Sequence, residues 1–308
     1  MDRPALTPST PLATDAPARL DACPAPAKLN LFLHVVGRRP DGYHLLQSVF
    51  TLIDWCDTLH VERRADGRIS REDLGPALPE DDLCTRAARA LQVASGTTLG
   101  AHIAIDKQVP WGAGLGGGSS DAATTLIALN RLWGLHWPRS RLLQLGLTLG
   151  ADVPFFIGGH NAWVEGIGEQ LTPIDLPPAA YAVLKPPVAV PTAAIFSSPL
   201  LTRDTPRTTI AVFLAQAKSF GKNDLQASAE AYSPQVVDGL EILKQNFGLS
   251  RMSGSGSAVF APCDAFRQEC SAQSPAELVR SLVDPGSGWL ARYCSSLESH
   301  PLLGWCTD

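Results

Sequence analysis

The sequence predicts a soluble protein of two domains in which helices and strands are mixed. A length of 308 residues, 45% of them hydrophobic, is enough to form two buried cores. Apolar residues alternate at 29–35 as in a strand, whereas those at 81–94 recur as on one face of a helix. A glycine-rich segment at 110–121 joins an expected strand at 102–105 to an expected helix at 122–133. That order of strand, loop and helix is the one that anion-binding sites use.

Composition argues against several classes of protein. The net charge of −5 gives no reason to expect nucleic acid as a partner. Seven cysteines are scattered without a C-x-x-C pair, which indicates reduced thiols and a cytoplasmic location. No apolar run approaches the length of a membrane span, so no membrane association is expected. Residues 1–22, rich in proline, alanine and threonine, predict a disordered tail without the hydrophobic core of a signal peptide.

The glycine-rich segment has the composition of a phosphate-binding loop. Five of the seven residues from Gly112 to Gly118 are glycines, which adopt positive φ and let a ligand approach the backbone closely. The helix that follows offers unpaired N–H groups and a partial positive charge to an anion. Ser119 and Ser120 are placed to cap this helix and to donate hydroxyls to phosphate oxygens.

Three other interpretations of this loop are weaker. Its glycines match the dinucleotide fingerprint, but no Asp or Glu lies between Asp121 and Asp152 to hold a ribose. A Walker loop needs a lysine after its last glycine, where this chain has Ser119. A flexible linker is not usually followed by an amphipathic helix. If the ligand is a triphosphate, its lysine must come from another part of the chain.

Two polar residues share one face of the strand expected at 27–35. The odd-numbered positions from 29 to 35 are apolar, so Lys28 and Asn30 point to the other side, together with Phe32 and His34. That face is either a solvent-exposed edge or the lining of a site. The alternation of residues alone leaves both open.

Asp152 lies in an apolar segment, between an expected helix at 140–149 and Pro154. A buried aspartate needs a cation or hydrogen-bond donors, and Lys28 is a candidate for that cation. The alternative is a turn-forming aspartate that caps its own backbone.

Two further turns carry groups suited to a ligand. The turn at 37–44 presents Tyr43 and His44, which either stack on and hydrogen-bond to a base or serve as packing residues. The Gly/Ser turn within 251–260 is either a tight connection between strands or a second backbone contact for an anion. Helices are expected at 208–218 and 233–246, and the last forty residues carry only an expected helix at 276–283.

Together these segments resemble the GHMP small-molecule kinases. The resemblance rests on five motifs in order between residues 24 and 261: Pro-Ala-Lys28-Leu-Asn30-Leu, Gly-Tyr43-His44, the glycine-rich loop to Ser120, Leu-Gly-Ala-Asp152-Val-Pro-Phe-Phe, and Ser-Gly254-Ser-Gly256. It implies an α+β fold of two domains, 23–165 for ATP and 166–308 for the substrate, with the active site in the cleft between them. It also implies ATP as the phosphoryl donor, Mg²⁺ with it, a small-molecule acceptor linked to cytidine diphosphate, and a monomer or homodimer.

The resemblance assigns roles to residues that bind the nucleotide and carry the chemistry. Lys28 and Asp152 match the catalytic pair, in which the carboxylate accepts the proton of the attacking hydroxyl and the lysine offsets charge on the γ-phosphate. Asp82 stands where relatives often carry an asparagine that contacts adenine. The triphosphate would be held by Pro110, Trp111, Gly112, Ala113, Gly114, Leu115, Gly116, Gly117, Gly118, Ser119 and Ser120.

The same resemblance assigns residues to the acceptor. Tyr43 and Phe196 match an aromatic pair that encloses the cytosine, with His44 at its polar edge and Thr192 nearby. Asn30 would help to hold the diphosphate or the sugar alcohol.

A second departure, besides Asp82, and three alternatives accompany this assignment. Asp121 stands where many relatives carry asparagine, which predicts a negative charge near the phosphates. The acceptor could instead be homoserine, mevalonate or another small alcohol, although the Gly-Tyr-His turn argues against this. A nucleotide sensor without catalysis is disfavoured by the intact Lys28 and Asp152. An oxidoreductase is disfavoured by the missing acidic residue after the loop.

Overall fold

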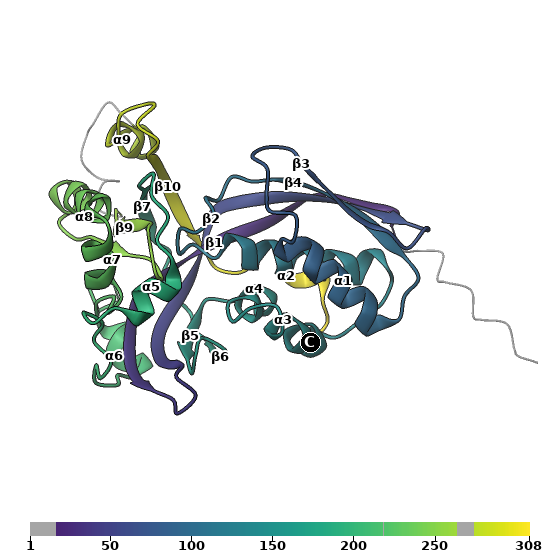
Figure 1. Ribbon diagram of the computed structural model, residues 1–308, viewed down its shortest axis with the longest axis horizontal. Helices are drawn as coiled ribbons and strands as arrows, with labels where there is room; N and C mark the ends of the chain where they lie inside the picture. The colour runs from purple at the N-terminus through teal and green to yellow at the C-terminus, as the bar shows by residue number, and fades with distance from the viewer. Residues whose placement is uncertain (1–16, 218, 264–273) are drawn as a thin grey trace, which may run out of the picture.

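The structure is a computed structural model that describes residues 17–217, 219–263 and 274–308. It has two lobes, which share one long β-hairpin. The hairpin consists of β1 (Arg19–Arg38) and β2 (His44–Arg64), which pair antiparallel with several bulges along the way. It runs from the lobe that carries α1 to α4 into the lobe that carries α5 to α8 (Figure 1). Both halves of the chain are therefore built on the same two strands.

The described strands form one sheet in the order β3-β4-β2-β10-β7-β9-β8, with β1 and β5 also paired to β2 and β6 paired to β5. β10 joins the two lobes, because it pairs with β2 at one end and with β7 over most of its length. The strands beyond the hairpin are β3 (Ile69–Asp73), β4 (Gly100–Asp106), β5 (Ala162–Glu165), β6 (Gln170–Pro173), β7 (Ala180–Lys185), β8 (Arg251–Met252), β9 (Val259–Pro262) and β10 (Leu290–Leu297).

The first lobe carries four helices, of which α1 and α2 pack against its sheet and α3 packs against α2 and α4. α2 lies at the centre of the core. Most residues of α2 are buried, whereas α1 is amphipathic and begins where the Asp82 side chain accepts the N–H of Thr85. α1 ends at Gly96, whose φ of +69° suits glycine. The helices are α1 (Leu83–Ser95), α2 (Gly117–Leu132), α3 (Arg139–Leu147) and α4 (Val153–Gly158).

The second lobe has its own core, and a third cluster lies between the lobes. Leu33 and Val35 of β1 are buried in the second core with residues of β7, β9 and α8. The third cluster packs Val109, Ala113 and Leu115 of the glycine-rich region against β1 and β9. The remaining helices are α5 (Thr192–Ser197), α6 (Ile210–Ala215), α7 (Gln226–Tyr232), α8 (Pro234–Phe247), α9 (Pro275–Ser281) and the short 3₁₀ helix η2 (Leu303–Trp305). In the part of the chain that is described, no helix has the length and apolarity needed to span a membrane.

Several expected boundaries were wrong. β1 begins at Arg19, so residues 19–22 belong to a strand, while residues 1–16 of the expected tail lie outside the described part. α2 begins at Gly117 rather than at 122, because the loop glycines and serines already adopt helical backbone. The helix expected at 208–218 is reduced to α6, and residue 218 lies outside the described residues.

The chain end returns to the first lobe, so the expected division at 165/166 does not describe the packing. Leu302 and Cys306 are buried in the first core, together with residues of α2 and α3. Arg139 at the start of α3 holds this segment, since its guanidinium donates to Ile157 O at 2.7 Å, to Leu303 O at 2.7 Å and to Cys306 O at 3.2 Å. Sequence patterns carry no signal for this contact, because a lone arginine before a helix is usually exposed.

Replacing Arg139 with methionine is expected to destabilise the first lobe. The variant leaves three carbonyl groups without their charged donor, and such bonds contribute about 1.5–3 kcal/mol each when they are not fully replaced by water. We therefore expect the free energy of unfolding in urea to fall by about 2–4 kcal/mol. Arg89→Met is the matched control, because Arg89 is exposed and lies 3.8 Å from Asp81. Equal effects of the two substitutions would contradict this account of the chain end.

Candidate active site

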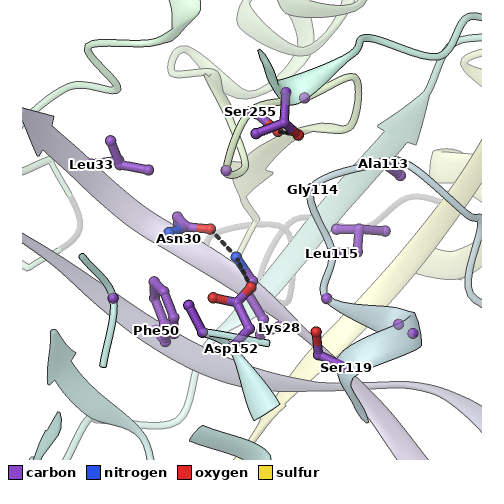
Figure 2. Close-up of a pocket in the computed structure, with 18 of the residues that line it drawn as sticks. Lys28, Asn30, Leu33, Phe50, Ala113, Gly114, Leu115, Ser119, Asp152 and Ser255 are labelled. Carbon is purple, nitrogen blue, oxygen red and sulfur yellow. Dashed lines mark hydrogen bonds and ion pairs between the residues drawn. The ribbon is translucent and has the colours of Figure 1, made fainter. Parts of the chain in front are cut away.

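A cavity of about 440 Å³ lies between the glycine-rich loop, β1, the start of α4 and the turn after β8. Figure 2 shows Lys28, Asn30 and Asp152 converging at its floor, with the loop along one side. Most residues expected to bind ligand line it: Lys28, Asn30, Asp152, Thr192, Phe196 and the loop from Pro110 to Ser119. Ser120, Tyr43, His44 and Asp82 do not line this cavity.

The loop has the backbone shape of an anion cradle. Gly112, Gly114 and Gly116 have φ of +65°, +74° and +72°, and they alternate with Ala113 and Leu115, whose φ is negative. Gly117, Gly118 and Ser119 are the first residues of α2, so their N–H groups have no acceptor within the helix. The expected capping by Ser119 or Ser120 was wrong, because Gly116 is the N-cap and makes no side-chain bond. The helix end is left open toward the cavity.

The second Gly/Ser turn packs directly against this loop. A Cβ on Gly114 would lie 2.2 Å from Ser253 O, so only glycine allows the approach. Ser253 Oγ donates to Gly114 O at 3.0 Å and accepts the N–H of Asn30 at 3.2 Å. Gly254, Ser255 and Gly256 line the cavity, so this turn does more than connect β8 to β9.

Lys28 and Asp152 form the charged centre of the cavity. Lys28 Nζ lies 3.5 Å from Asp152 Oδ2, with the lysine side chain 4% exposed and the aspartate 31% exposed. The turn-capping alternative for Asp152 was wrong, because this residue precedes α4 without a side-chain cap bond. Lys28 Nζ also donates to Asn30 Oδ1 and lies 4.5 Å from the centroid of the Phe50 ring. The expectation that Lys28 and Asn30 share one face is thus confirmed, and that face lines a cavity.

A chain of hydrogen bonds fixes the orientation of the Asn30 side chain. Its Nδ2 donates to Ser48 Oγ at 3.1 Å, and the Ser48 hydroxyl in turn donates to Phe32 O. The amide oxygen therefore faces the Lys28 ammonium, which holds the lysine head beside Asp152. This chain of bonds crosses from β1 to β2 and makes the geometry a property of the hairpin.

The Asp121 side chain, which was expected to place a negative charge near the phosphates, is instead enclosed in a buried cluster. Asp121 is buried, and its carboxylate lies 2.6 Å from Lys107 Nζ, which also bonds to Asp57. Burial raises the pKa of Asp121 well above its usual range, with Asp57 adding to the effect and Lys107 opposing it. Asp57 accepts the N–H groups of Gln108 and Val109 at 2.6 and 2.7 Å. The cluster thereby ties α2 to the strand end that leads into the loop.

A smaller pocket of about 190 Å³ adjoins the cavity and shares Leu83, Trp111 and Gly118 with it. Asp82 lines this pocket, but its Oδ1 already accepts the N–H of Thr85 and lies 2.9 Å from Arg71 Nη1. Trp111 is 70% exposed at the junction of the two spaces.

The expected base-binding residues are only partly assembled. Tyr43 is 60% exposed and stands outside the cavity lining. The His44 ring lies 5.2 Å from the Phe196 ring, with 31° between their planes, and Phe196 lines the cavity. The Thr192 hydroxyl lies 2.8 Å from Ser255 Oγ, so α5 is bonded to the second Gly/Ser turn.

Sequence patterns missed Lys107, Asp57 and Phe50, and they gave Ser253 only as part of the second Gly/Ser turn. The signal that points to Lys107 is Asp121, because an acidic residue among the apolar positions of a buried helix needs a cation. Ser253 and Phe50 carry no such signal, since each acts through a neighbour that is distant in sequence.

Two protein-family models match this chain. The model of the GHMP kinases N terminal domain matches residues 82–160, and that of the GHMP kinases C terminal matches residues 206–277. The 4-diphosphocytidyl-2-C-methyl-D-erythritol kinase of Methylibium petroleiphilum is 66% identical over 282 residues, which cover 92% of this chain and 96% of that protein. The kinase of the same name from Paracidovorax citrulli is 56% identical over 289 residues, which cover 92% and 97%.

Solved structures agree with these relatives. The crystal structure of a 4-(cytidine 5′-diphospho)-2C-methyl-D-erythritol kinase has a TM-score of 0.72 at 35% identity, covering 88% of this chain and 98% of that one. A mevalonate kinase of Methanococcus jannaschii has a TM-score of 0.64 at 14% identity, covering 92% of this chain and 100% of that one, and so shares the fold.

The fold and the glycine-rich loop beside a charged cavity define a GHMP kinase, an ATP-dependent enzyme that phosphorylates a small molecule. Within that class the chain belongs to the 4-diphosphocytidyl-2-C-methyl-D-erythritol kinase family. The expected α+β kinase fold is thereby confirmed.

Replacing Asp121 with asparagine is expected to flatten the pH dependence of stability. Because burial raises the pKa of this carboxyl, the native protein holds a proton there that the unfolded chain releases above about pH 4. Wild-type stability should therefore fall, relative to Asp121→Asn, as the pH rises from about 4 through that raised pKa. Urea unfolding at a series of pH values measures this difference. Asp81→Asn is the control, since Asp81 is exposed; parallel profiles for wild type and Asp121→Asn would contradict the assignment.

Proposed function

We propose that the chain transfers the γ-phosphoryl group of ATP to the 2-hydroxyl of 4-diphosphocytidyl-2-C-methyl-D-erythritol. The observation that carries this proposal is the placement of Lys28 and Asp152, 3.5 Å apart, in the same cavity as the glycine-rich loop. The substrate is supported by the shared name of the relatives that are 66% and 56% identical. The reaction belongs to the methylerythritol phosphate route to isoprenoid precursors.

The loop and α2 would hold the triphosphate. Open N–H groups at the start of a helix and the helix dipole both favour negative charge, and they need no rearrangement during the reaction. Glycines at positive φ allow phosphate oxygens to reach the backbone. The adjoining pocket with Asp82 and Trp111 would receive the adenine, because it opens from the loop.

A magnesium ion would fit this site if it is bound mainly by the phosphates of the nucleotide. Among the described residues there is no group of three His, Cys, Asp or Glu side chains suited to a metal. Mg²⁺ commonly keeps several waters and binds through phosphates with few protein ligands. The Ser119 hydroxyl at the loop would be such a ligand, and the ion would neutralise charge on the transferred phosphate.

Asp152 would act as the general base. Phosphoryl transfer needs positioning and charge neutralisation more than covalent chemistry from the protein. In this scheme Asp152, which is partly exposed to the cavity, accepts the proton of the attacking hydroxyl. Lys28, held by Asn30 and Asp152, directs that hydroxyl and offsets charge on the γ-phosphate.

The acceptor would lie toward the second lobe. Asn30 and Thr192 line the cavity on the way to α5, where Phe196 offers a ring face to a base. Tyr43 would close over the other face of the cytosine, and His44 would bond its polar edge. A solvent-exposed tyrosine next to a flat ligand is a suitable partner for stacking.

Asp152→Asn is expected to reduce kcat about a hundredfold or more, because general bases contribute roughly 10²- to 10⁴-fold. The dissociation constant of ATP should change by less than about threefold, since the loop and α2 are untouched. Lys28→Met should behave in the same way. Steady-state kinetics and calorimetric titration with ATP provide the two readouts, and Asp238→Asn on the exposed face of α8 is the control.

An acceptor panel separates this function from its neighbours in the class. ADP release should require the cytidine-linked alcohol and should be absent with homoserine or mevalonate. Near-normal turnover by Asp152→Asn would overturn the role of the base, whereas turnover of another alcohol alone would overturn the substrate.

Tyr43→Ala is expected to raise the KM of the cytidine-linked acceptor far more than that of ATP. Loss of one stacking face costs about 1–3 kcal/mol, or roughly 5- to 150-fold in KM. Tyr232→Ala is the matched control, because that tyrosine is 49% exposed on α7 and lies outside the cavity lining. A similar rise in both KM values for Tyr43→Ala would indicate a packing role instead.

A further inference from the structure

Arg203, in the connection between α5 and α6, bonds to both members of the His44–Phe196 pair. Its Nε donates to His44 Nε2 at 3.3 Å. Its Nη2 donates to Phe196 O at 3.3 Å and to Ser198 O at 2.9 Å, and its Nη1 donates to Leu201 O at 3.1 Å. One guanidinium thus links the start of β2 to the C-terminal turn of α5.

The chemistry of this contact determines the state of the imidazole. A guanidinium only donates hydrogen bonds, so His44 Nε2 must accept and cannot carry a proton. The neutral ring then has its proton on Nδ1. Protonation would place an Nε2–H against the Arg203 Nε–H, and this contact would become repulsive.

The charged groups around His44 also favour the neutral imidazole. Arg203 approaches from the α5–α6 connection, and Arg38 is the partner of His44 in the β1–β2 register. The turn adds Arg39 and Asp41, which pair with each other at 2.6 Å, while α5 contributes the uncharged Phe196. Burial lowers the pKa of His44, and Arg203 and Arg38 lower it further. The imidazole therefore stays neutral below the usual pH range of histidine.

Arg203 also holds Phe196, whose ring lies beside the His44 ring. α5 has only six residues and ends at Ser197, so its last carbonyls need donors from elsewhere. The guanidinium supplies them at Phe196 and Ser198, on either side of that end. A cation at a helix C-terminus is also favoured by the helix dipole.

We propose that Arg203 is a positioning residue for base recognition, which keeps His44 as the neutral Nδ1–H tautomer and holds Phe196 beside it. This inference rests on the proposed function, in which the His44–Phe196 pair receives the cytosine of the acceptor. In that arrangement Nδ1–H is a fixed donor for an acceptor atom on the edge of a pyrimidine. Arg203 acts through His44 and Phe196 and does not line the cavity itself.

The tautomer can be measured on the wild-type protein without substrate. Histidine labelled with ¹⁵N, observed through long-range ¹H–¹⁵N correlation at about pH 7.5, distinguishes a protonated Nδ1 from a protonated Nε2. His44 is assigned by the signal that disappears in His44→Phe. We expect a protonated Nδ1 and an unprotonated Nε2. A protonated Nε2 would overturn the proposal whether or not the substrate assignment is correct.

Kinetics test the consequence for recognition. Arg203→Met should raise the KM of the cytidine-linked acceptor about tenfold or more at about pH 8, with kcat and the KM of ATP changed less than about threefold. That KM should rise further as the pH falls toward about 6, because His44 regains a pKa closer to its usual value. Wild type and the control Arg207→Met should stay flat over this range, since Arg207 is exposed and pairs with Glu165.

Two further variants separate positioning from general stability. Arg203→Lys keeps the cation but loses the planar fork, so it should restore only part of the wild-type KM. In a His44→Phe background, Arg203→Met should change the acceptor KM less than it does in wild type, because part of its effect acts through that ring. An acceptor KM for Arg203→Met within threefold of wild type at all pH values would overturn the inference. If wild type itself did not use the cytidine-linked acceptor, the proposed function would fall, and the tautomer measurement would still decide the state of His44.

Discussion

Contact between two glycine turns is the constraint on which the site depends. Ser253 O lies so close to Gly114 that no side chain fits between them, and the Ser253 hydroxyl bonds both to Gly114 O and to the N–H of Asn30. One serine thus sets the distance between the glycine-rich loop and the strand that carries Lys28. Ala258 N adds a bond to Ala113 O at 3.0 Å, so the two lobes meet through backbone. The Ala258–Ala113 bond and the approach of Ser253 O to Gly114 involve backbone atoms alone, so neither depends on a side-chain rotamer.

A second feature of the site is that its buried ionisable side chains contact one another. Lys28 is paired with Asp152 at the floor of the cavity, and Lys107 is paired with Asp57 and Asp121 behind the loop. An unpaired charge in either place would cost several kcal/mol. The two clusters differ in access to solvent. Asp152 is partly exposed and available to a substrate, whereas Asp121 is enclosed and holds α2 in place.

Local sequence was a good guide wherever the chemistry is carried by residues close together in the chain. The five glycines before a helix predicted a loop of glycines at positive φ that opens into a helix, and the alternation at 28–35 correctly placed Lys28 and Asn30 on one face. Boundaries were less predictable. α2 begins within the glycines because tertiary packing of Gly116 and Gly117 against Phe156 and Val109 outweighs their low helix propensity. The strand β10 and the return of the chain end to the first lobe had no local signal, since both depend on partners more than a hundred residues away.

The sequence by itself determined the class of the protein, the glycine-rich loop before a helix and the two residues of the charged pair, because a short motif with a specific chemical requirement encodes each of them. Only the tertiary structure decided how those motifs meet. It brought Asp152 to Lys28 across more than a hundred residues, balanced Asp121 with Lys107, and placed Arg203 on His44. The physical reason is that pairing of buried charges and hydrogen-bond donors depends on distance in space, which residue order along a chain does not specify.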